Sequence, residues 1–423
     1  TMAFPRMARV RQKFHAPKID DIPAEVESQM AALNLGEKVH SGQTIAITAG
    51  SRGIANIALI IKSICDHVKS VGGVPIIVPA MGSHGGGTAE GQRAIIEGYG
   101  VTEEFTGAEI RASMETVVVD ETSHGIPVHF DKVAFECDHV IVCGRVKPHT
   151  SFVGPIESGL HKMMLIGLGK HAGAKIYHRA ILDYSFTEII QAVAESVLRK
   201  CDILCGVAIV ENAYDETRTI EAVAPGNFYE RECELLKLSV EAMPKLPFDS
   251  VQLLIIDEIG KNISGSGMDT NIIGRKYNDH AATEKDKVKV RRIFVRGLTE
   301  ATHGNACGLG MAEFTNTRTA QAVDKKITAI NSLTGGHPSA AGIPCHFDSD
   351  REVIENALAT VGFVEPENAR VVQIADTLHL GEVLVSEACL AEVADRDDLE
   401  VIDGPFEMPF DENGNLAAVG IGH

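Results

Sequence analysis

The sequence predicts an α/β protein with two domains, each built on a mostly parallel sheet. Short apolar runs alternate with segments whose apolar residues recur at helical spacing, which is the pattern of βαβ units. The chain has 423 residues, and at about 150 residues per domain this length accommodates two or three domains. Hydrophobic residues make up 44% and charged residues 23% of the chain, so each domain can bury a core.

The alternation begins with a strand at Thr44–Thr48 and a helix over Ile54–Val68, which Gly72 and Gly73 end. A second strand is expected at Val74–Ala80, followed by a helix from Thr88 to Gly98. The same pattern continues to residue 243, with strands at Val117–Asp120, His139–Cys143 and Ile203–Val210 and helices at Ser185–Leu198 and Tyr229–Met243.

Two prolines in the segment Met243–Asp249 indicate a domain boundary. We expect residues 1–246 to form an N-terminal α/β domain and residues 247–423 to form a C-terminal one. The region 260–290 is rich in Gly, Asn and Lys, which favours a long loop. The other C-terminal elements are expected as strands at Val251–Asp257, Arg292–Arg296, Arg370–Ile374 and Glu400–Ile402, and helices near Ala320–Ile330 and Asp350–Val361.

Composition excludes several classes of protein. The net charge of −19 disfavours a nucleic-acid binder, because phosphate contacts need a basic surface. No apolar run approaches the roughly 20 residues of a membrane span, and the basic N-terminus lacks the apolar core of a secretory signal. The nine cysteines form no CxxC pair and are typical of buried thiols in a reducing compartment. We therefore expect a cytoplasmic protein with neither nucleic-acid nor membrane partners.

Residues 145–179 form a cationic island in this acidic chain. They contain six Lys or Arg and one acid, Glu157, so their net charge is 6 − 1 = +5. Such an island fits an anion-binding active site; the alternative is a basic surface helix that pairs with acidic neighbours. Five glycines disfavour the long helix that this alternative needs. The island also holds four of the 17 histidines, namely His149, His161, His171 and His178.

Three polar loops follow probable parallel strands, where α/β folds bind ligands. Arg52 lies in the loop after the first strand, and its planar fork suits a carboxylate or phosphate. His84 lies in the glycine-rich loop after the second strand, and His149 follows the strand at His139–Cys143. No Walker A loop is present. The GxGxxG fingerprint is also absent, which argues against a nicotinamide dehydrogenase.

Together, these residues resemble the nickel-dependent lactate racemase family, over roughly residues 44–180. The resemblance rests on Arg52, the "GSH" histidine His84, the "KPHTSF" histidine His149, Lys162 in "SGLHKMM", and His178 in "YHRA". It implies two α/β domains, with the cofactor and catalytic residues in the N-terminal domain. The C-terminal domain would close an active site in the cleft between them.

The resemblance further implies a nickel pincer nucleotide as cofactor. Lys162 would be its covalent tether through a thioamide, and His178 would supply the remaining nickel ligand. This makes coordination sense, because Ni(II) favours square-planar sites, the pincer gives three donors in a plane, and one imidazole completes four. Cofactor-assembly proteins would be required as partners.

The implied activity is that of an isomerase, a racemase or epimerase acting on a small anionic 2-hydroxy acid. The α-hydrogen of such an acid is hard to remove as a proton, so hydride removal to a 2-keto acid is the alternative. A base must then take the hydroxyl proton on either face, which are the roles implied for His84 and His149. Arg52 would orient the carboxylate.

Two features leave the substrate open. The stretch between His149 and Lys162 is longer than expected for the lactate enzyme, and the loops at Arg52 and His84 depart from its sequence. A larger acid, such as a sugar acid, is therefore plausible. Contacts to it are expected from Lys261–Asp269 and His303–Asn316, including Glu313 and Asn316. A non-catalytic homologue that binds an anionic ligand or metal is the alternative function.

The remaining histidines and lysines near these motifs are expected to be structural. His161 and His171 flank the motifs and are assigned structural or supporting roles. Lys147 and Lys170 are expected to be surface lysines. The other histidines placed in the structural class are His124, His129 and His139.

Overall fold

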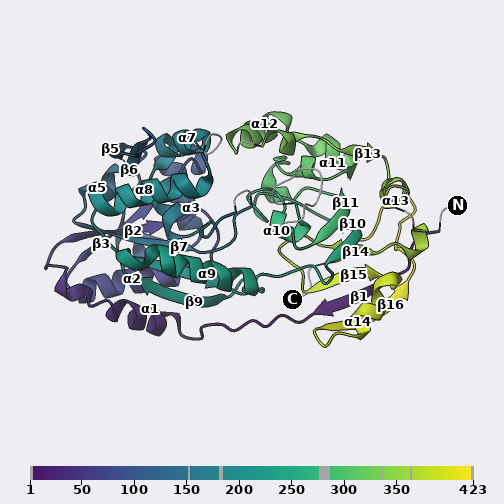
Figure 1. Cartoon of the computed structure of the whole chain (residues 1–423), viewed down its shortest axis with the longest axis horizontal. Coiled ribbons are helices and arrows are strands. Elements are labelled where there is room, and N and C mark those ends of the chain that lie inside the picture. Colours follow the sequence, from purple (N-terminus) through teal and green to yellow (C-terminus); the bar gives the residue numbers. More distant parts are fainter. Residues whose placement is uncertain are drawn as a thin grey trace. The chain divides into compact units, whose positions relative to one another are not determined.

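The computed structural model describes residues 3–150, 153–180, 184–275, 286–335, 337–362 and 364–420, without the side chains of residues 178 and 179. The chain is α/β, as predicted, and divides into two compact units (Figure 1). The N-unit comprises Ala16–His149 and Val153–Met243, whereas the C-unit comprises the residues up to His15, Thr150, and the residues from Pro244 onward.

The N-unit is built on a six-stranded sheet in the order β4-β3-β2-β7-β8-β9. Every neighbouring pair is parallel except β8 and β9. Ile47 lies at the centre, where it pairs with Ile77 on one side and Ile141 on the other. The strands are β2 (Thr44–Ala49), β3 (Val74–Pro79), β4 (Glu109–Ile110), β7 (His139–Arg145), β8 (Ile203–Glu211) and β9 (Thr217–Val223).

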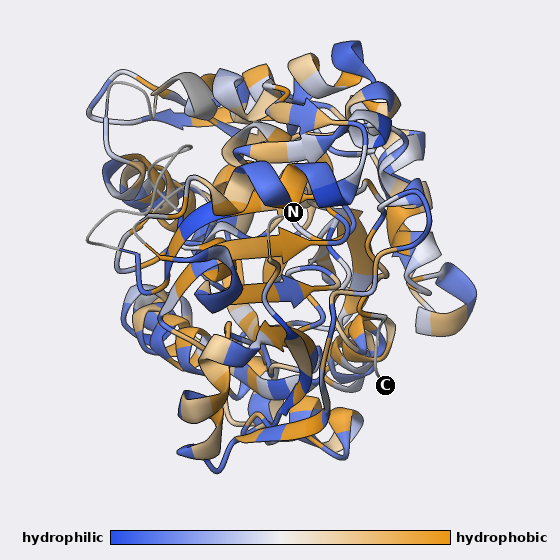
Figure 2. Ribbon diagram, turned by 90° about the vertical axis from the view of Figure 1, so that its right-hand side faces the viewer, coloured by the Kyte–Doolittle hydropathy of each residue, from blue (hydrophilic) through white to orange (hydrophobic). Residues whose placement is uncertain are grey.

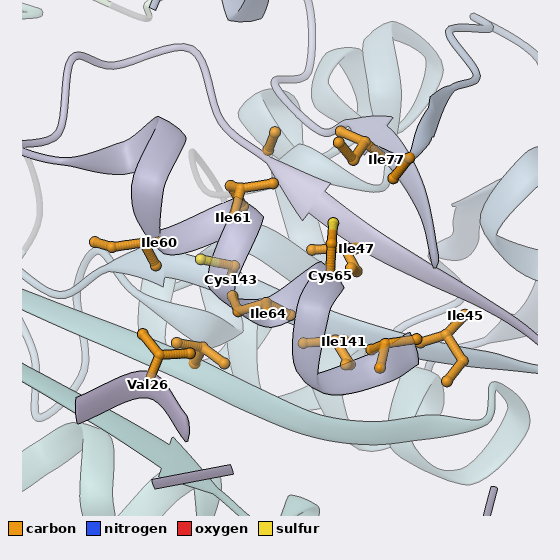
Figure 3. Packing of buried hydrophobic residues seen from close by; sticks show 14 of the residues in the cluster. Val26, Ile45, Ile47, Ile60, Ile61, Ile64, Cys65, Ile77, Ile141 and Cys143 are labelled. Atoms are coloured by element: carbon orange, nitrogen blue, oxygen red, sulfur yellow. The ribbon is translucent and has the colours of Figure 1, made fainter. Parts of the chain in front are cut away.

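Helices α1 (Ile22–Ala31) and α2 (Ile57–Ser70) bury their apolar faces against this sheet. Figure 3 shows Ile61, Ile64 and Cys65 of α2 packed beside the strand residues Ile47 and Ile77. The other helices of the N-unit are α3 (Ala89–Gly98), α4 (Glu103–Thr106), α5 (Lys132–Glu136), α6 (Leu160–Lys162), α7 (Lys170–Ala180), α8 (Phe186–Lys200) and α9 (Phe228–Ala242).

Two N-unit predictions need correction. Helix α2 begins at Ile57 rather than Ile54, because Asn56 has a left-handed conformation (φ +60°) and the preceding residues form a loop. The strand predicted at Val117–Asp120 lies outside the parallel sheet. It belongs to β5 (Thr116–Glu121), which pairs only with β6 (Pro127–Asp131) in an antiparallel hairpin. Its Val118 is 59% exposed, as expected of a ribbon outside the core.

The C-unit contains an eight-stranded mixed sheet in the order β13-β12-β11-β10-β14-β15-β1-β16. Its first five strands are mutually parallel, and β15, β1 and β16 are antiparallel. Figure 2 shows the strands beside the N-terminus mostly in orange, as expected for a buried sheet. The strands are β1 (Met7–Gln12), β10 (Ser250–Ile256), β11 (Lys289–Val295), β12 (Phe314–Asn316), β13 (Cys345–Phe347), β14 (Val371–Ile374), β15 (Glu382–Ser386) and β16 (Leu399–Phe406).

Strand β1 overturns the prediction that residues 1–246 form one domain. It buries Met7, Ala8 and Val10 between β15 and β16, and therefore places the N-terminal segment in the C-unit. The later changeover, between Met243 and Pro244, lies three residues from the predicted boundary at 246/247.

The C-unit helices differ from the predictions in two places. A short helix, Thr270–Ile273, lies in the region 260–290 that was expected to be a long loop, and residues 276–285 of that region are outside the described residues. The helix expected near Ala320–Ile330 is two helices, α11 (Thr317–Ala322) and α12 (Lys325–Thr334), because Asp324 accepts from the backbone N–H groups of Lys326 and Ile327 and starts a new helix. The others are α10 (Thr270–Ile273), α13 (Asp350–Leu358) and α14 (Leu390–Ala394). Among the described residues, no helix is both long enough and apolar enough to cross a membrane.

The packing of the N-unit predicts the effect of an Ile47→Ala substitution. Ile47 is completely buried, so its truncation should lower the free energy of unfolding by about 2–5 kcal/mol in chemical denaturation. Val74, at the start of β3, is 46% exposed, and Val74→Ala should change the stability by no more than about 0.5 kcal/mol. Equal effects of the two substitutions would contradict this core.

Candidate active site

Three loops meet at the carboxyl edge of the N-unit sheet. Strands β3, β2 and β7 are neighbours and parallel, so the loops that follow them emerge on the same side. The loop after β2 carries Arg52, the loop after β3 carries His84, and the segment after β7 carries His149. The topology therefore brings these three predicted site residues to one edge.

Ser51 joins the first two loops directly. Its hydroxyl is hydrogen-bonded to Nδ1 of His84, and its carbonyl accepts from the phenol of Tyr99 at 2.9 Å. His84 is exposed to solvent, but its ring is held through Nδ1. A fixed imidazole is what a general acid or base requires. The sequence analysis did not single out Ser51 or Tyr99.

Charged residues at the ends of β7 and β8 support the Arg52 loop. Arg145 donates to the Gly53 carbonyl at 3.2 Å and forms an ion pair with Glu211. Glu211 in turn accepts from the Ala55 N–H at 2.7 Å. Arg52 is accessible to solvent yet surrounded by protein atoms, and its pKa is lowered by loss of hydration and by the positive charge of Arg145. An anionic ligand would relieve this repulsion.

The segment that carries Lys162 lies across the same edge. Helix α6 continues into a π-helical turn at Met163–Gly167, a distortion often found at functional sites. The Met163 side chain lies against Gly50 and Gly144, where added Cβ atoms would come within 3.3 and 3.5 Å of its Cε. Ile166 packs on Gly82 so closely that a Cβ there would lie 2.9 Å from its Cγ2. Because glycines lie at these contacts, the segment Met163–Gly167 can pack closely on the ends of the strands.

The surroundings of Lys162 favour the neutral form of its amine. Its pKa is lowered to about 7, first by burial and then by the positive charges of Arg52 and Lys147, against the opposing effect of Glu157. The side chain keeps partial solvent contact, so it is enclosed without being sealed. A lysine with such a pKa is a nucleophile near neutral pH.

Glu157 anchors the His149 segment. Its buried carboxylate accepts from the N–H of His149 at 2.6 Å and from the N–H of Gly154 at 3.3 Å. The His149 ring stacks on Phe186 of α8, with ring centroids 6.0 Å apart and planes at 26°. Glu157 therefore both positions His149 and acts electrostatically on Lys162. The sequence showed Glu157 only as the single acid of the cationic island.

The neighbouring histidines are tied into the fold. His161 is buried, and Glu232 accepts from both its backbone N–H, at 3.1 Å, and its ring Nδ1, at 2.8 Å. His129 contacts Thr116 and His139 contacts Asp202, at 2.9 and 2.8 Å. These contacts fit the structural roles expected for the three histidines.

Lys170 is not a surface lysine, and that prediction is wrong. Its side chain is completely buried and pairs with Asp131, also completely buried, at 2.8 Å. The two residues are 39 positions apart, on α7 and at the end of β6. No local pattern marks Lys170 as buried, because its partner is supplied by the fold.

The metal-ligand prediction falls on a residue whose side chain is not described. The backbone of His178 lies in α7, but its side chain is outside the described part of the structure. Within the described residues, no group of three or more His, Cys, Asp or Glu side chains is arranged to hold a metal ion. The role of His178 stays a prediction.

Segments expected to contact the substrate line a pocket in the C-unit. Lys261 and Ser266 from one segment, and Cys307 and Met311 from the other, surround it together with Thr150. The two side chains named from sequence have other partners. Glu313 pairs with the buried Arg275 at 2.8 Å. Asn316 caps α11 and donates to Asp350 at 2.9 Å.

Comparison with known proteins agrees with this geometry. Residues 10–188 match the family model described as the lactate racemase N-terminal domain. This part of the chain is similar to a lactate racemase N-terminal domain. The resemblance predicted from the motifs is therefore confirmed, and the matched range includes all five predicted site residues.

A solved structure extends the likeness of fold to most of the chain. The lactate racemase apoprotein from Thermoanaerobacterium thermosaccharolyticum aligns with a TM-score of 0.52 at 15% identity, covering 87% of this chain and 94% of that one. A Thermotoga maritima protein gives a TM-score of 0.47 at 14% identity, over 75% and 82% of the two chains. No curated protein sequence matches the chain.

The environment of Lys162 predicts its reactivity. At pH 7 to 8 an amine-reactive reagent should label Lys162 much faster than the exposed Lys175, because the lowered pKa gives Lys162 a substantial neutral fraction. Peptide mass spectrometry across a pH series gives both midpoints. Arg52→Met removes a positive neighbour, which favours the ammonium form, so the Lys162 midpoint should move to higher pH. A Lys162 midpoint near that of Lys175 in the unsubstituted protein would contradict this assignment.

Proposed function

We propose that the protein is a racemase or epimerase that inverts C2 of a 2-hydroxy acid. One observation carries the proposal: the poised amine of Lys162 lies across the sheet edge where the loops of Arg52, His84 and His149 emerge. The match to the lactate racemase N-terminal domain covers all of these residues. Lys162 supplies a nucleophilic amine. Arg52 supplies a guanidinium group that can bind a carboxylate, and the two histidines supply imidazoles.

The residues present fit a nickel pincer nucleotide. Lys162 would tether it, since amide-type bond formation needs a neutral amine and the surroundings of this lysine favour that form. His178 would supply the protein ligand to nickel. The positive charges of Arg52 and Lys147, which already repel the ammonium form of Lys162, would attract an anionic cofactor or substrate. When bound, this cofactor supplies a reversible acceptor for the C2 hydride.

The chain's own residues account for the remaining steps. Arg52 binds the substrate carboxylate and fixes its orientation. One imidazole takes the hydroxyl proton as the 2-keto acid forms, and an imidazole returns a proton when the hydroxyl is rebuilt. His84 and His149 reach the edge from different loops, which suits proton transfer to and from the hydroxyl on either face of the substrate. The neutral ring accepts the proton, and the imidazolium that forms can return one.

The proposed substrate is larger than lactate. The loops at Arg52 and His84 and the stretch between His149 and Lys162 depart from the lactate-type pattern, and all three border the site. The segments expected to contact the substrate line a pocket in the C-unit whose wall includes the polar side chains of Lys261 and Ser266. A sugar acid or another polar 2-hydroxy acid would match such a lining.

Interconversion of enantiomers or epimers tests the proposal. The protein is co-expressed with cofactor-assembly proteins that load a known lactate racemase, and then incubated with a panel of enantiopure 2-hydroxy acids and aldonic acids. Chiral chromatography should show inversion of at least one of them. His84→Asn and His149→Asn should each lower the rate by about 10²- to 10⁴-fold. His40→Asn is the matched control, because His40 is exposed and lies before β2.

A negative panel also has a defined meaning. If the loaded protein inverts no acid of the panel, the non-catalytic homologue that only binds an anion becomes the better description. Full activity in both histidine variants would instead refute the assigned acid and base.

A further inference from the structure

Lys170 lies at the centre of a buried polar cluster next to the His84 loop. It opens α7 with φ +52°, and its side chain is completely buried. An ammonium group has three protons, and three acceptors from different elements surround this one. They are Asp131 Oδ2 at 2.8 Å, Gln92 Oε1 at 3.3 Å, and the carbonyl of Pro79 at the end of β3.

Gln92 connects Lys170 to the His84 loop through hydrogen bonds. It is completely buried on α3, and its two amide protons go to the carbonyls of Gly82, at 2.9 Å, and His84, at 3.2 Å. Lysine can only donate, so Oε1 of Gln92 must face Lys170 and its NH₂ group must face the loop. Lys170 therefore sets the orientation in which Gln92 can hold the two carbonyls.

We propose that Lys170 and Gln92 are positioning residues that hold His84 in its working place, with Asp131 neutralising the buried charge. This inference rests on the proposed function, in which His84 is an acid and base. Gln92 fixes the carbonyl of His84 and Ser51 fixes its ring, so the residue is anchored on both sides of its Cα. The loop between His84 and Gln92 contains Gly85, Gly86 and Gly87, all at positive φ. The His84 carbonyl also accepts from the Gly87 N–H at 3.2 Å, so Gln92 adds a side-chain bond to a turn of flexible residues.

A buried ion pair such as Lys170 and Asp131 is weak evidence for a role in stability, because such pairs can often be replaced by apolar groups without loss of stability. Here the arrangement joins the His84 loop to the first residue of α7, the helix whose backbone carries His178. The cluster would thus fix the position of His84, the proposed base, relative to the helix that carries His178, the proposed nickel ligand.

Two variants separate positioning from folding. Gln92→Met removes both donations to the loop and leaves no new charge. Lys170→Met alone would leave Asp131 buried and unpaired, so it is combined with Asp131→Asn, which removes the charge and keeps the side-chain oxygen that accepts from the Ala134 N–H at the start of α5. Lys175→Met, an exposed position on α7, is the control. In the cofactor-free protein, amide hydrogen exchange of residues 81–88 should accelerate about tenfold in Gln92→Met, because two hydrogen bonds to the loop are lost. The same exchange should also accelerate in the double variant, because Gln92 then loses the donor that fixes the orientation of its amide. Exchange in β2 and β7 should not change.

A second readout reports on the imidazole itself. The NMR titration of His84, assigned with His84→Asn, should shift in Gln92→Met and in the double variant but not in Lys175→Met. In loaded, active protein the same variants should lower kcat with little change in KM. Unchanged loop exchange together with an unchanged His84 titration would overturn the inference, whatever the activity. Faster loop exchange and a shifted titration in a protein that inverts no hydroxy acid would support the positioning role and refute the proposed function.

Discussion

Met163 and Ile166 pack directly on glycines at the ends of three neighbouring strands, and the rest of the site depends on this contact. Gly82 and, less tightly, Gly50 leave room for the π-helical turn across the ends of β3 and β2, and Met163 also contacts Gly144 of β7. Gly82 is the most constrained of them, because it combines φ +61° with a close approach of Ile166. The residue before Met163 is Lys162, so the contact delivers its amine to the edge where Arg52, His84 and His149 emerge.

Concentrated positive charge gives this edge its chemistry. Arg52 and Lys147 disfavour a third positive charge on Lys162, and burial acts in the same direction, so the amine is neutral at an unusually low pH. Two carboxylates hold the arrangement together from outside the reacting groups: Glu211 secures the Arg52 loop through Arg145, and Glu157 secures the backbone of His149. An anionic ligand would complete a site that is electrostatically incomplete without one.

The sequence revealed the parts of the site that depend on local pattern. Apolar runs mark β2, β3 and β7, and polar residues just after them can be placed at one edge by the parallel topology alone. Residues that depend on distant partners were missed. Lys170 is buried because a hairpin 39 residues earlier brings Asp131 to it, and β1 belongs to the C-unit because Met7 pairs with Ser386. Ser51 acts on His84 only through a contact between two loops. None of these leaves a trace in the periodicity of its own segment.

The intact mass of the denatured protein, made together with assembly proteins that load a known lactate racemase, tests the central claim most directly. The account predicts a mass increase of nucleotide size that maps to the peptide containing Lys162 and is absent in Lys162→Ala, while Lys175→Ala keeps it. An unmodified mass under the same conditions would contradict the assignment of Lys162 as a tether and leave the edge as an anion-binding site.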